Sequence, residues 1–235
     1  MSNLFVALDA TWPAATTRRA GGWLIREGQG GGKRVSCATA VDDSAIDGIA
    51  AAETAQMALG QPLLFGLRDG QDALDQALAA RGYDRIEPVE LFSAPARQMA
   101  AEPPAHLSSF PLWPPLAIAR DVWTEGGNGA ERQAVMDRAP GPKTAILGRT
   151  GDRAAGAVFV ALHRDTAMIH ALHVDAAARR QGLGRNLMRA AAAWAVGEGA
   201  TTVALAVTRA NHPATALYTA LGMVVVGHYH YRIKG

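Results

Sequence analysis

The chain has 235 residues with a formal net charge of +2 at pH 7, and 49% of its residues are hydrophobic. These values predict a packed core in one or two domains, and the near balance of charge gives no case for nucleic-acid binding. The single cysteine, Cys37, excludes an internal disulfide. Because the sequence has neither a long apolar run nor a signal-peptide pattern, we expect a cytoplasmic protein without a membrane partner.

The first 94 residues alternate between strand-like and helix-like segments. A glycine cluster from Gly28 to Gly32 precedes Lys33, but it lacks the spacing of a Walker A phosphate loop, and no helix is predicted after it. We therefore interpret the cluster as a hairpin turn. The expected strands lie at 21–26, 33–41, 62–67 and 89–92, and the expected helices at 45–59 and 71–80.

Six prolines between Pro95 and Pro115 mark the middle of the chain. This density of proline predicts a linker or extended crossover rather than a packed element. We therefore predict domains at 1–94 and 116–235, joined by a linker at 95–115. In the second domain, the expected helices lie at 117–123 and 130–138, and the expected strands at 143–148, 155–163 and 167–174.

One stretch of the second domain has a glycine turn between a strand and a helix. Gly182 and Gly184 have no side chains, so a ligand can approach the backbone of the turn closely. The first amides of the following helix have no intrahelical partners, and the helix dipole attracts anions there. Arg179, Arg180 and Arg185 add positive charge, which favours a phosphate or pyrophosphate. The stretch comprises the strand Met168–Val174, the turn Arg179–Gly184, the helix Arg185–Val196, the strand Val203–Val207 and a helix that follows Asn211 and ends at Gly222.

Two common phosphate motifs do not fit this turn. A Walker A loop needs Lys followed by Ser or Thr after its last glycine, whereas Arg185-Asn186 stands here. A dinucleotide fingerprint needs a third glycine and an acidic residue after the next strand. The spacing Arg179-x-x-Gly182-x-Gly184 instead resembles the acyl-coenzyme A loop of the GNAT acetyltransferase superfamily.

The resemblance covers roughly the last half of the chain. It implies an α/β, GNAT-like acyl-CoA N-acyltransferase fold with a mixed central sheet flanked by helices. Leu221-Gly222-Met223 resembles the usual Leu-Gly-Phe of the family, whereas Ala176 stands where members often have proline. Further implied roles are pantetheine pairing by the backbone of Leu172, His173 and Val174, pyrophosphate binding by Arg179, Arg180, Gln181, Gly182, Leu183, Gly184 and Arg185, a cofactor contact by Asn211, and protonation of the departing thiolate by Tyr218.

The activity that the resemblance implies is an acetyltransferase reaction. An acetyl group would pass from acetyl-CoA to the primary amine of a small molecule or a peptide by direct attack, with coenzyme A as product and no metal. An alternative is a module that senses acyl-CoA without turnover, and a third is a site for another phosphate ligand. The oligomeric state stays open, with a homodimer as one option.

Several histidines could take part in proton transfer. His170 and His173 are expected on opposite faces of their strand, because side chains alternate there. Either could take the proton of an ammonium acceptor, and the alternative is that both are packing residues. The segment His228–Tyr231 predicts a final strand rather than a metal site.

The order of predicted elements repeats along the chain. Subtracting 140 from the second-half numbers places the strand Val203–Val207 on Leu63–Leu67 and Gly222 on Gly82. At the positions in the first half that correspond to four site residues, other residues stand: Asp42 for Gly182, Ser44 for Gly184, Gln71 for Asn211 and Leu78 for Tyr218. A carboxylate in the glycine turn would repel a pyrophosphate. We therefore predict two similar domains in tandem, the first of them degenerate and without a cofactor loop.

Overall fold

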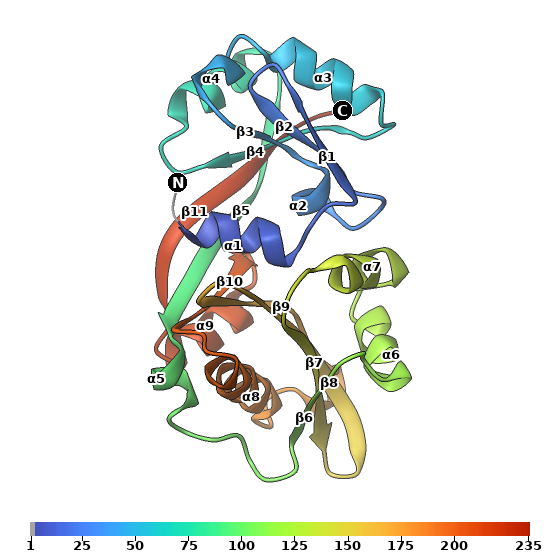
Figure 1. Ribbon diagram of the computed structural model, residues 1–235, viewed down its shortest axis with the longest axis vertical. Coiled ribbons are helices and arrows are strands. Elements are labelled where there is room, and N and C mark those ends of the chain that lie inside the picture. The colour runs from blue at the N-terminus through green and yellow to red at the C-terminus, as the bar shows by residue number, and fades with distance from the viewer. Residues whose placement is uncertain (1–2) are drawn as a thin grey trace. The chain divides into compact units, whose positions relative to one another are not determined.

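The structure, a computed structural model, describes residues 3–235 and contains helices and strands throughout that range (Figure 1). The helices are α1 Asn3–Thr11, α2 Lys33–Ser36, η1 Asp43–Ala45, α3 Ile49–Met57, α4 Asp72–Ala80, α5 Ala96–Ala100, α6 Ala117–Glu125, α7 Ala130–Arg138, η2 Ala176–Ala178, α8 Leu183–Gly197 and α9 His212–Ala220. The strands are β1 Thr16–Ala20, β2 Trp23–Glu27, β3 Ala38–Ala40, β4 Leu63–Arg68, β5 Asp84–Pro95, β6 Ser109–Leu112, β7 Lys143–Thr150, β8 Arg153–His163, β9 Thr166–Val174, β10 Thr202–Thr208 and β11 Val224–Lys234.

Hydrogen bonds connect the strands in the order β1-β2-β3-β4-β11-β5-β10-β9-β8-β7-β6. Parallel pairs, such as β3 with β4 and β9 with β10, occur beside antiparallel pairs, such as β7 with β8. The predicted α/β fold with a mixed sheet is therefore confirmed. None of the helices in the described range is long and apolar enough to cross a membrane.

The described chain forms two compact units whose boundaries differ from the predicted ones. Unit 1 consists of the residues up to Trp12 together with Leu91–Val207 and Asn211–Val226. Unit 2 consists of Pro13–Glu90, Thr208–Ala210 and Gly227–Gly235. The first helix thus belongs to the same unit as the second half of the chain, and the last residues belong with the first half. Sequence order alone does not show such an exchange of end segments.

The segment predicted as a linker is part of the packed structure of unit 1. Within it, α5 buries Ala96 and Met99, and β6 pairs with β7 from Ser109↔Gly148 to Leu112↔Ala145. The prediction of a linker at 95–115 was therefore wrong. Pro111 is tolerated within β6 because β6 is the last strand in the sheet order, where a missing N–H breaks no inner ladder.

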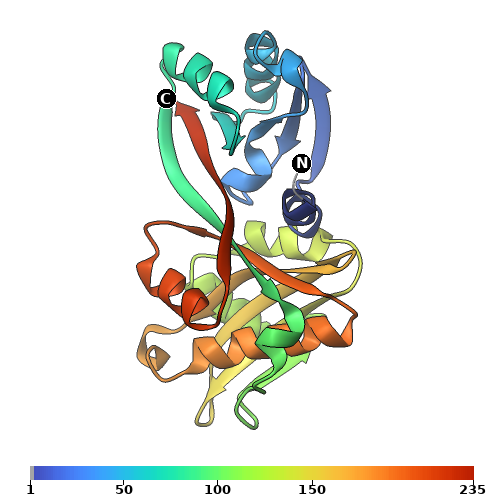
Figure 2. The same cartoon turned by 90° about the vertical axis from the view of Figure 1, so that its left-hand side faces the viewer.

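In unit 1, helices cover both faces of the strands β7, β8 and β9. On one face, α8 packs with these strands and with β6 (Figure 2). Its buried residues recur at helical spacing, as Leu183, Leu187, Ala191 and Ala195 show. On the other face, α6 packs against the same three strands (Figure 1). The site described below lies where α8 begins.

Unit 2 has a smaller core built around Trp23, Phe65 and Leu78. Two predictions for this unit need correction. The strand expected at 33–41 is shorter, because α2 occupies its first residues and β3 spans only Ala38–Ala40. The helix expected at 45–59 is divided into η1 and α3.

The predicted internal repeat is confirmed at the level of element order. Shifted by 140, α9 falls on 72–80, which is the range of α4, and α8 falls on 43–57, which η1 and α3 span together. The connection before the helix differs between the two halves. Eight residues, Asp175 to Gly182, separate β9 from α8, whereas two residues, Val41 and Asp42, separate β3 from η1. The first half therefore lacks the length of chain that forms the glycine turn.

Candidate active site around β9 and the start of α8

The strands β9 and β10 pair only along their first halves. Their parallel pairing runs from Thr166↔Thr202 to Ile169↔Leu205 and stops there. Beyond Ile169, β9 continues to pair with β8 as far as Val174↔Gly156. The backbone edge of β9 that faces β10 is therefore open over the last residues of the strand, which include the predicted pantetheine-binding residues. An open edge of this kind can accept an extended ligand as an additional strand.

A β-bulge interrupts β9 next to this open edge. The register with β8 shifts between Ala157 and Phe159, and Ala171 has a φ of +48°. A non-glycine residue in this region costs on the order of 1–2 kcal/mol. The indole Nε1 of Trp123 donates to the Ala171 carbonyl at 2.9 Å, and Trp123 is fully buried on α6.

The bulge also corrects the prediction for the two histidines. Phe159 pairs with His170 and Ala157 pairs with His173. Because Phe159 and Ala157 are two residues apart, they face the same side of β8, and their partners therefore face one side of β9. The prediction that His170 and His173 lie on opposite faces was wrong, since the bulge adds a residue between them.

His170 and His173 differ in their surroundings. His170 is buried, with its Nε2 at 2.9 Å from the Thr11 hydroxyl and its ring centroid 5.0 Å from that of Trp12, in a tilted arrangement. The His173 side chain is 18% exposed, and its Nε2 lies 3.5 Å from a carboxylate oxygen of Asp175. Gly126 packs so closely on the His173 ring that a Cβ there would lie 2.4 Å from Nδ1. His173 is thus the more accessible of the two rings.

The glycine turn is held by side-chain bonds to its own backbone. Arg179 Nε donates to the Val174 carbonyl at 3.1 Å, and Gln181 Nε2 donates to the Ala177 carbonyl at 2.9 Å. Gly182 is the N-cap residue of α8, with a left-handed φ of 85°. A glycine adopts this conformation without the penalty of a side chain.

The first turn of α8 is suited to an anion. The first helical hydrogen bond runs from Asn186 N–H to the Gly182 carbonyl, which leaves the amides of Leu183, Gly184 and Arg185 without intrahelical acceptors. No acidic residue lies in this turn, and no side chain caps it. A Cβ on Gly182 would meet no atom within 4 Å. The residues therefore fit a pyrophosphate, with the exposed Arg179, Arg180 and Arg185 around it.

The helix α9 places Asn211 and Tyr218 in the same unit. Asn211 is the N-cap residue of α9, and its side chain accepts from the Ala214 amide at 3.3 Å. Tyr218 is 6% exposed and packs against Phe92 of β5 with ring centroids 5.8 Å apart. Burial raises the pKa of the Tyr218 phenol to about 12. Within the described residues, its hydroxyl has no hydrogen-bond partner.

Gly184 brings the three predicted segments together. A Cβ at this position would lie 3.3 Å from Leu217 of α9 and 3.9 Å from Val174 of β9. The start of α8 therefore touches both the open strand β9 and the helix that carries Tyr218. The contact of Trp123 with the bulge has no counterpart among the sequence predictions, so its role there was missed.

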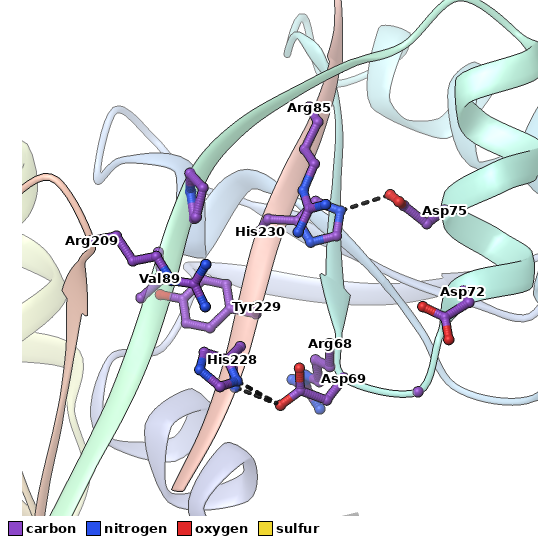
Figure 3. Close-up of a pocket in the computed structure, with 12 residues that line it drawn as sticks. Arg68, Asp69, Asp72, Asp75, Arg85, Val89, Arg209, His228, Tyr229 and His230 are labelled. Carbon is purple, nitrogen blue, oxygen red and sulfur yellow. Dashed lines mark hydrogen bonds and ion pairs between the residues drawn. The ribbon is translucent and has the colours of Figure 1, made fainter. Parts of the chain in front are cut away.

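A separate pocket of about 120 Å³ lies in unit 2, lined mainly by residues of β4, α4, β5 and β11 (Figure 3). None of the predicted site residues lines it. Its lining holds three arginines and three aspartates, and two of the aspartates lie beside histidines: His228 is 3.4 Å from Asp69, and His230 is 2.7 Å from Asp75 (Figure 3). Walls that neutralise each other leave little net charge for a ligand, so we do not place the active site here.

Comparison with known proteins decides the family. Residues 111–223, which include β9, the glycine turn and α9, match the model of the acetyltransferase (GNAT) family. This matched part of the chain belongs to the GNAT acetyltransferase superfamily, a family of acyltransferases. The resemblance inferred from the glycine turn is confirmed. The uncharacterized N-acetyltransferase YobR of Bacillus subtilis is 26% identical over 234 residues, which cover 96% of this chain and 95% of that protein.

Solved structures show that the fold likeness extends beyond the GNAT-matching half. A GCN5-related N-acetyltransferase from Kribbella flavida has a TM-score of 0.74 at 18% identity, covering 99% of this chain and 94% of that one. A tandem GNAT protein from the clavulanic acid biosynthesis pathway has a TM-score of 0.61 at 15% identity, covering 95% and 84%. At these identities the likeness concerns the fold alone. It supports two GNAT-like halves in tandem.

Proposed function

We propose that the protein transfers an acetyl group from acetyl-CoA to a primary amine. The observation that carries this proposal is the start of α8, where three backbone amides are open, three arginines are exposed and no carboxylate intervenes. The open edge of β9 lies directly before this turn in the chain. One feature suits the pyrophosphate of coenzyme A and the other suits its extended pantetheine arm.

The roles of the binding residues follow from this arrangement. When bound, acetyl-CoA supplies an activated acyl thioester. The amides of Leu183, Gly184 and Arg185 would hold its pyrophosphate, with charge from Arg179 and the neighbouring arginines. The backbone of residues 172–174 would pair with the pantetheine arm, and an amide of the same strand would donate to the thioester carbonyl.

Two side chains would manage the protons. Tyr218 is a neutral phenol at physiological pH, as a tyrosine with the ordinary pKa near 10 already is, and burial raises its pKa further, to about 12. Its unpaired hydroxyl is free to protonate the departing thiolate. His173 is better placed than His170 to take a proton from the ammonium form of the acceptor, since His170 is buried against Thr11. The neutral amine then attacks the thioester directly.

Calorimetric titration with acetyl-CoA tests the binding half of the proposal. Wild-type protein should bind one equivalent, and Gly182→Glu should abolish binding because the new carboxylate would face the open amides. Gly199→Glu is the matched control, since Gly199 has a φ of +84° and a Cβ there would also meet no atom within 4 Å. Gly199 follows the opposite end of α8, so this variant should bind normally. Failure of the wild-type protein to bind acetyl-CoA would end the proposal.

Turnover is tested separately from binding. Release of free thiol from acetyl-CoA should depend on an added amine, and a panel of small amines and amine-bearing peptides would define the acceptor. The available Tyr218 hydroxyl favours an enzyme over a sensor that only binds. Binding without thiol release for any acceptor in the panel would instead support the sensor.

We also propose that the first half of the chain binds no cofactor. The Asp42 side chain accepts a hydrogen bond from the Ser44 amide at 3.1 Å, so the chain's own carboxylate occupies the start of η1. The hydrogen bonds from Ser44 lower the pKa of Asp42, which keeps this carboxylate charged. A stoichiometry of two acetyl-CoA molecules per chain would contradict this proposal.

A further inference from the structure

The bulge in β9 needs support from outside the sheet. At a bulge one residue drops out of the ladder, and its backbone groups must find other partners. Ala171 also adopts a positive φ, which a non-glycine residue keeps only where its surroundings enforce it. The Ala171 carbonyl accepts from the indole of Trp123 at 2.9 Å. Since an indole can only donate, this pairing satisfies both groups.

Trp123 is itself fixed on both sides. It is fully buried, and its own carbonyl accepts from the Asn128 amide at 2.7 Å. The buried side chain of Gln133 then donates to the Asn128 carbonyl at 2.9 Å and to the Arg120 carbonyl at 3.0 Å. The turn between α6 and α7 is therefore tied to the backbone of the residue that carries the indole. A rigid donor of this kind can define the direction of the carbonyl that it binds.

The direction of the Ala171 carbonyl also determines that of an amide in the proposed site. In a trans peptide the C=O and N–H bonds point in opposite directions. Holding the Ala171 carbonyl on Trp123 therefore turns the Leu172 N–H away from α6. Leu172 begins the segment that the proposed function assigns to the acyl-pantetheine arm. The orientation of this peptide thus depends on a residue of another element.

We propose that Trp123 is a positioning residue, whose indole N–H holds the Ala171–Leu172 peptide in the orientation that aligns the acyl thioester. This inference rests on the proposed function and assigns no contact between Trp123 and a ligand. Loss of the indole donor should weaken alignment of the acyl group. The glycine turn, which holds the pyrophosphate, should be unaffected.

The test compares two buried tryptophans whose indole N–H groups each donate a hydrogen bond to a backbone carbonyl. Trp23 in unit 2 is also fully buried, and its indole donates to the Ala45 carbonyl at 2.7 Å. Trp123→Phe and Trp23→Phe each remove one such bond and a similar volume. Each variant would be titrated with acetyl-CoA and with coenzyme A, and its thiol release measured with the best amine of the panel. Thermal unfolding would report the structural cost of each change.

The expected result separates positioning from general damage. Trp123→Phe should keep its affinity for coenzyme A within about threefold, lose most of any preference for acetyl-CoA and lower kcat at least tenfold. Trp23→Phe should change neither the preference for acetyl-CoA over coenzyme A nor kcat, although both variants should unfold at a lower temperature than the wild type. If Trp123→Phe does not fold, 3-benzothienylalanine at position 123 replaces the N–H by sulfur and keeps the ring shape.

Each outcome bears on one claim. An unchanged kcat and ligand preference in the position-123 variants would overturn the role of Trp123 while leaving the proposed function intact. An equal loss in the Trp23 variant would also overturn it, because the effect would then be one of stability. A wild-type protein that binds neither acetyl-CoA nor coenzyme A would overturn the proposed function and this inference together.

Discussion

Removing the hydroxyl of Tyr218 tests the proposed acid without disturbing the fold. The hydroxyl has no hydrogen-bond partner among the described residues, and the side chain is 6% exposed. Tyr218→Phe therefore removes no protein hydrogen bond, and the free energy of unfolding should change by less than about 0.5 kcal/mol. The melting temperature should stay within about 2 °C of the wild-type value.

The effect on catalysis should be large in comparison. A positioned general acid contributes about 10²- to 10⁴-fold to the rate, so kcat of Tyr218→Phe should fall about 100-fold. The Kd for acetyl-CoA should stay within about twofold, because the hydroxyl is not among the groups proposed to hold the pyrophosphate or the pantetheine. Calorimetry and thiol-release kinetics measure the two quantities independently.

Tyr83 provides the matched control. It is 2% exposed in unit 2, and its hydroxyl donates to a Glu53 carboxylate oxygen at 2.7 Å. Tyr83→Phe breaks a hydrogen bond to a charged group, so the free energy of unfolding should fall by about 2 kcal/mol while kcat is unchanged. The reasoning is refuted if kcat of Tyr218→Phe stays within threefold of the wild type, or if both variants lose kcat equally.

Three further predictions concern other residues. Asn211→Ser should keep the cap of α9 and its stability but weaken acetyl-CoA binding several-fold, whereas Asn211→Ala should also lose about 1 kcal/mol in thermal unfolding. Gly126→Ala should displace the His173 ring, because its Cβ would lie 2.4 Å from that ring, and should therefore lower both the melting temperature and kcat. If kcat falls less in this variant than in His173→Gln, the displacement of His173 is contradicted. A hydrogen bond from Arg232 lowers the pKa of Asp75 to about 2, so its stabilisation is present above pH 4 and lost as pH falls toward 2. The free energy of unfolding of Asp75→Asn should not show this loss at low pH. We place the loss in the wild type at roughly 1 kcal/mol because solvent screens the Asp75–Arg232 pair, and acid unfolding of the two proteins measures it.

The parts of the site that follow from sequence are those determined locally. Gly182 and Gly184 stand at the start of a helix whose amides are open whatever packs around them, so the spacing of the turn predicted its geometry. Asn211 and Pro213 likewise mark the start of α9. These features need only the residues within one helical turn. They were therefore readable before the fold was known.

The features that could not be predicted depend on contacts between distant residues. Nothing in the sequence around Ala171 indicates a positive φ, because the bulge is supported by Trp123, 48 positions away. The faces of His170 and His173 follow from the same bulge, so the regular alternation of a strand gave the wrong answer. Pro111 was interpreted as part of a linker because its strand, β6, forms only by pairing with β7, which lies more than 30 residues later in the chain.

The two halves of the chain differ most clearly in the connection before one helix. In each half a connection and a helical segment lie between two strands that pair in parallel, and the later elements match at a constant shift of 140. What differs is the connection, eight residues ending in Gly182 in one half and two residues ending in Asp42 in the other. In the first half the Asp42 carboxylate bonds the Ser44 amide, an anion supplied by the chain itself. The start of a helix attracts negative charge. After the short connection the Asp42 carboxylate supplies this charge, whereas no side chain supplies it after the long connection.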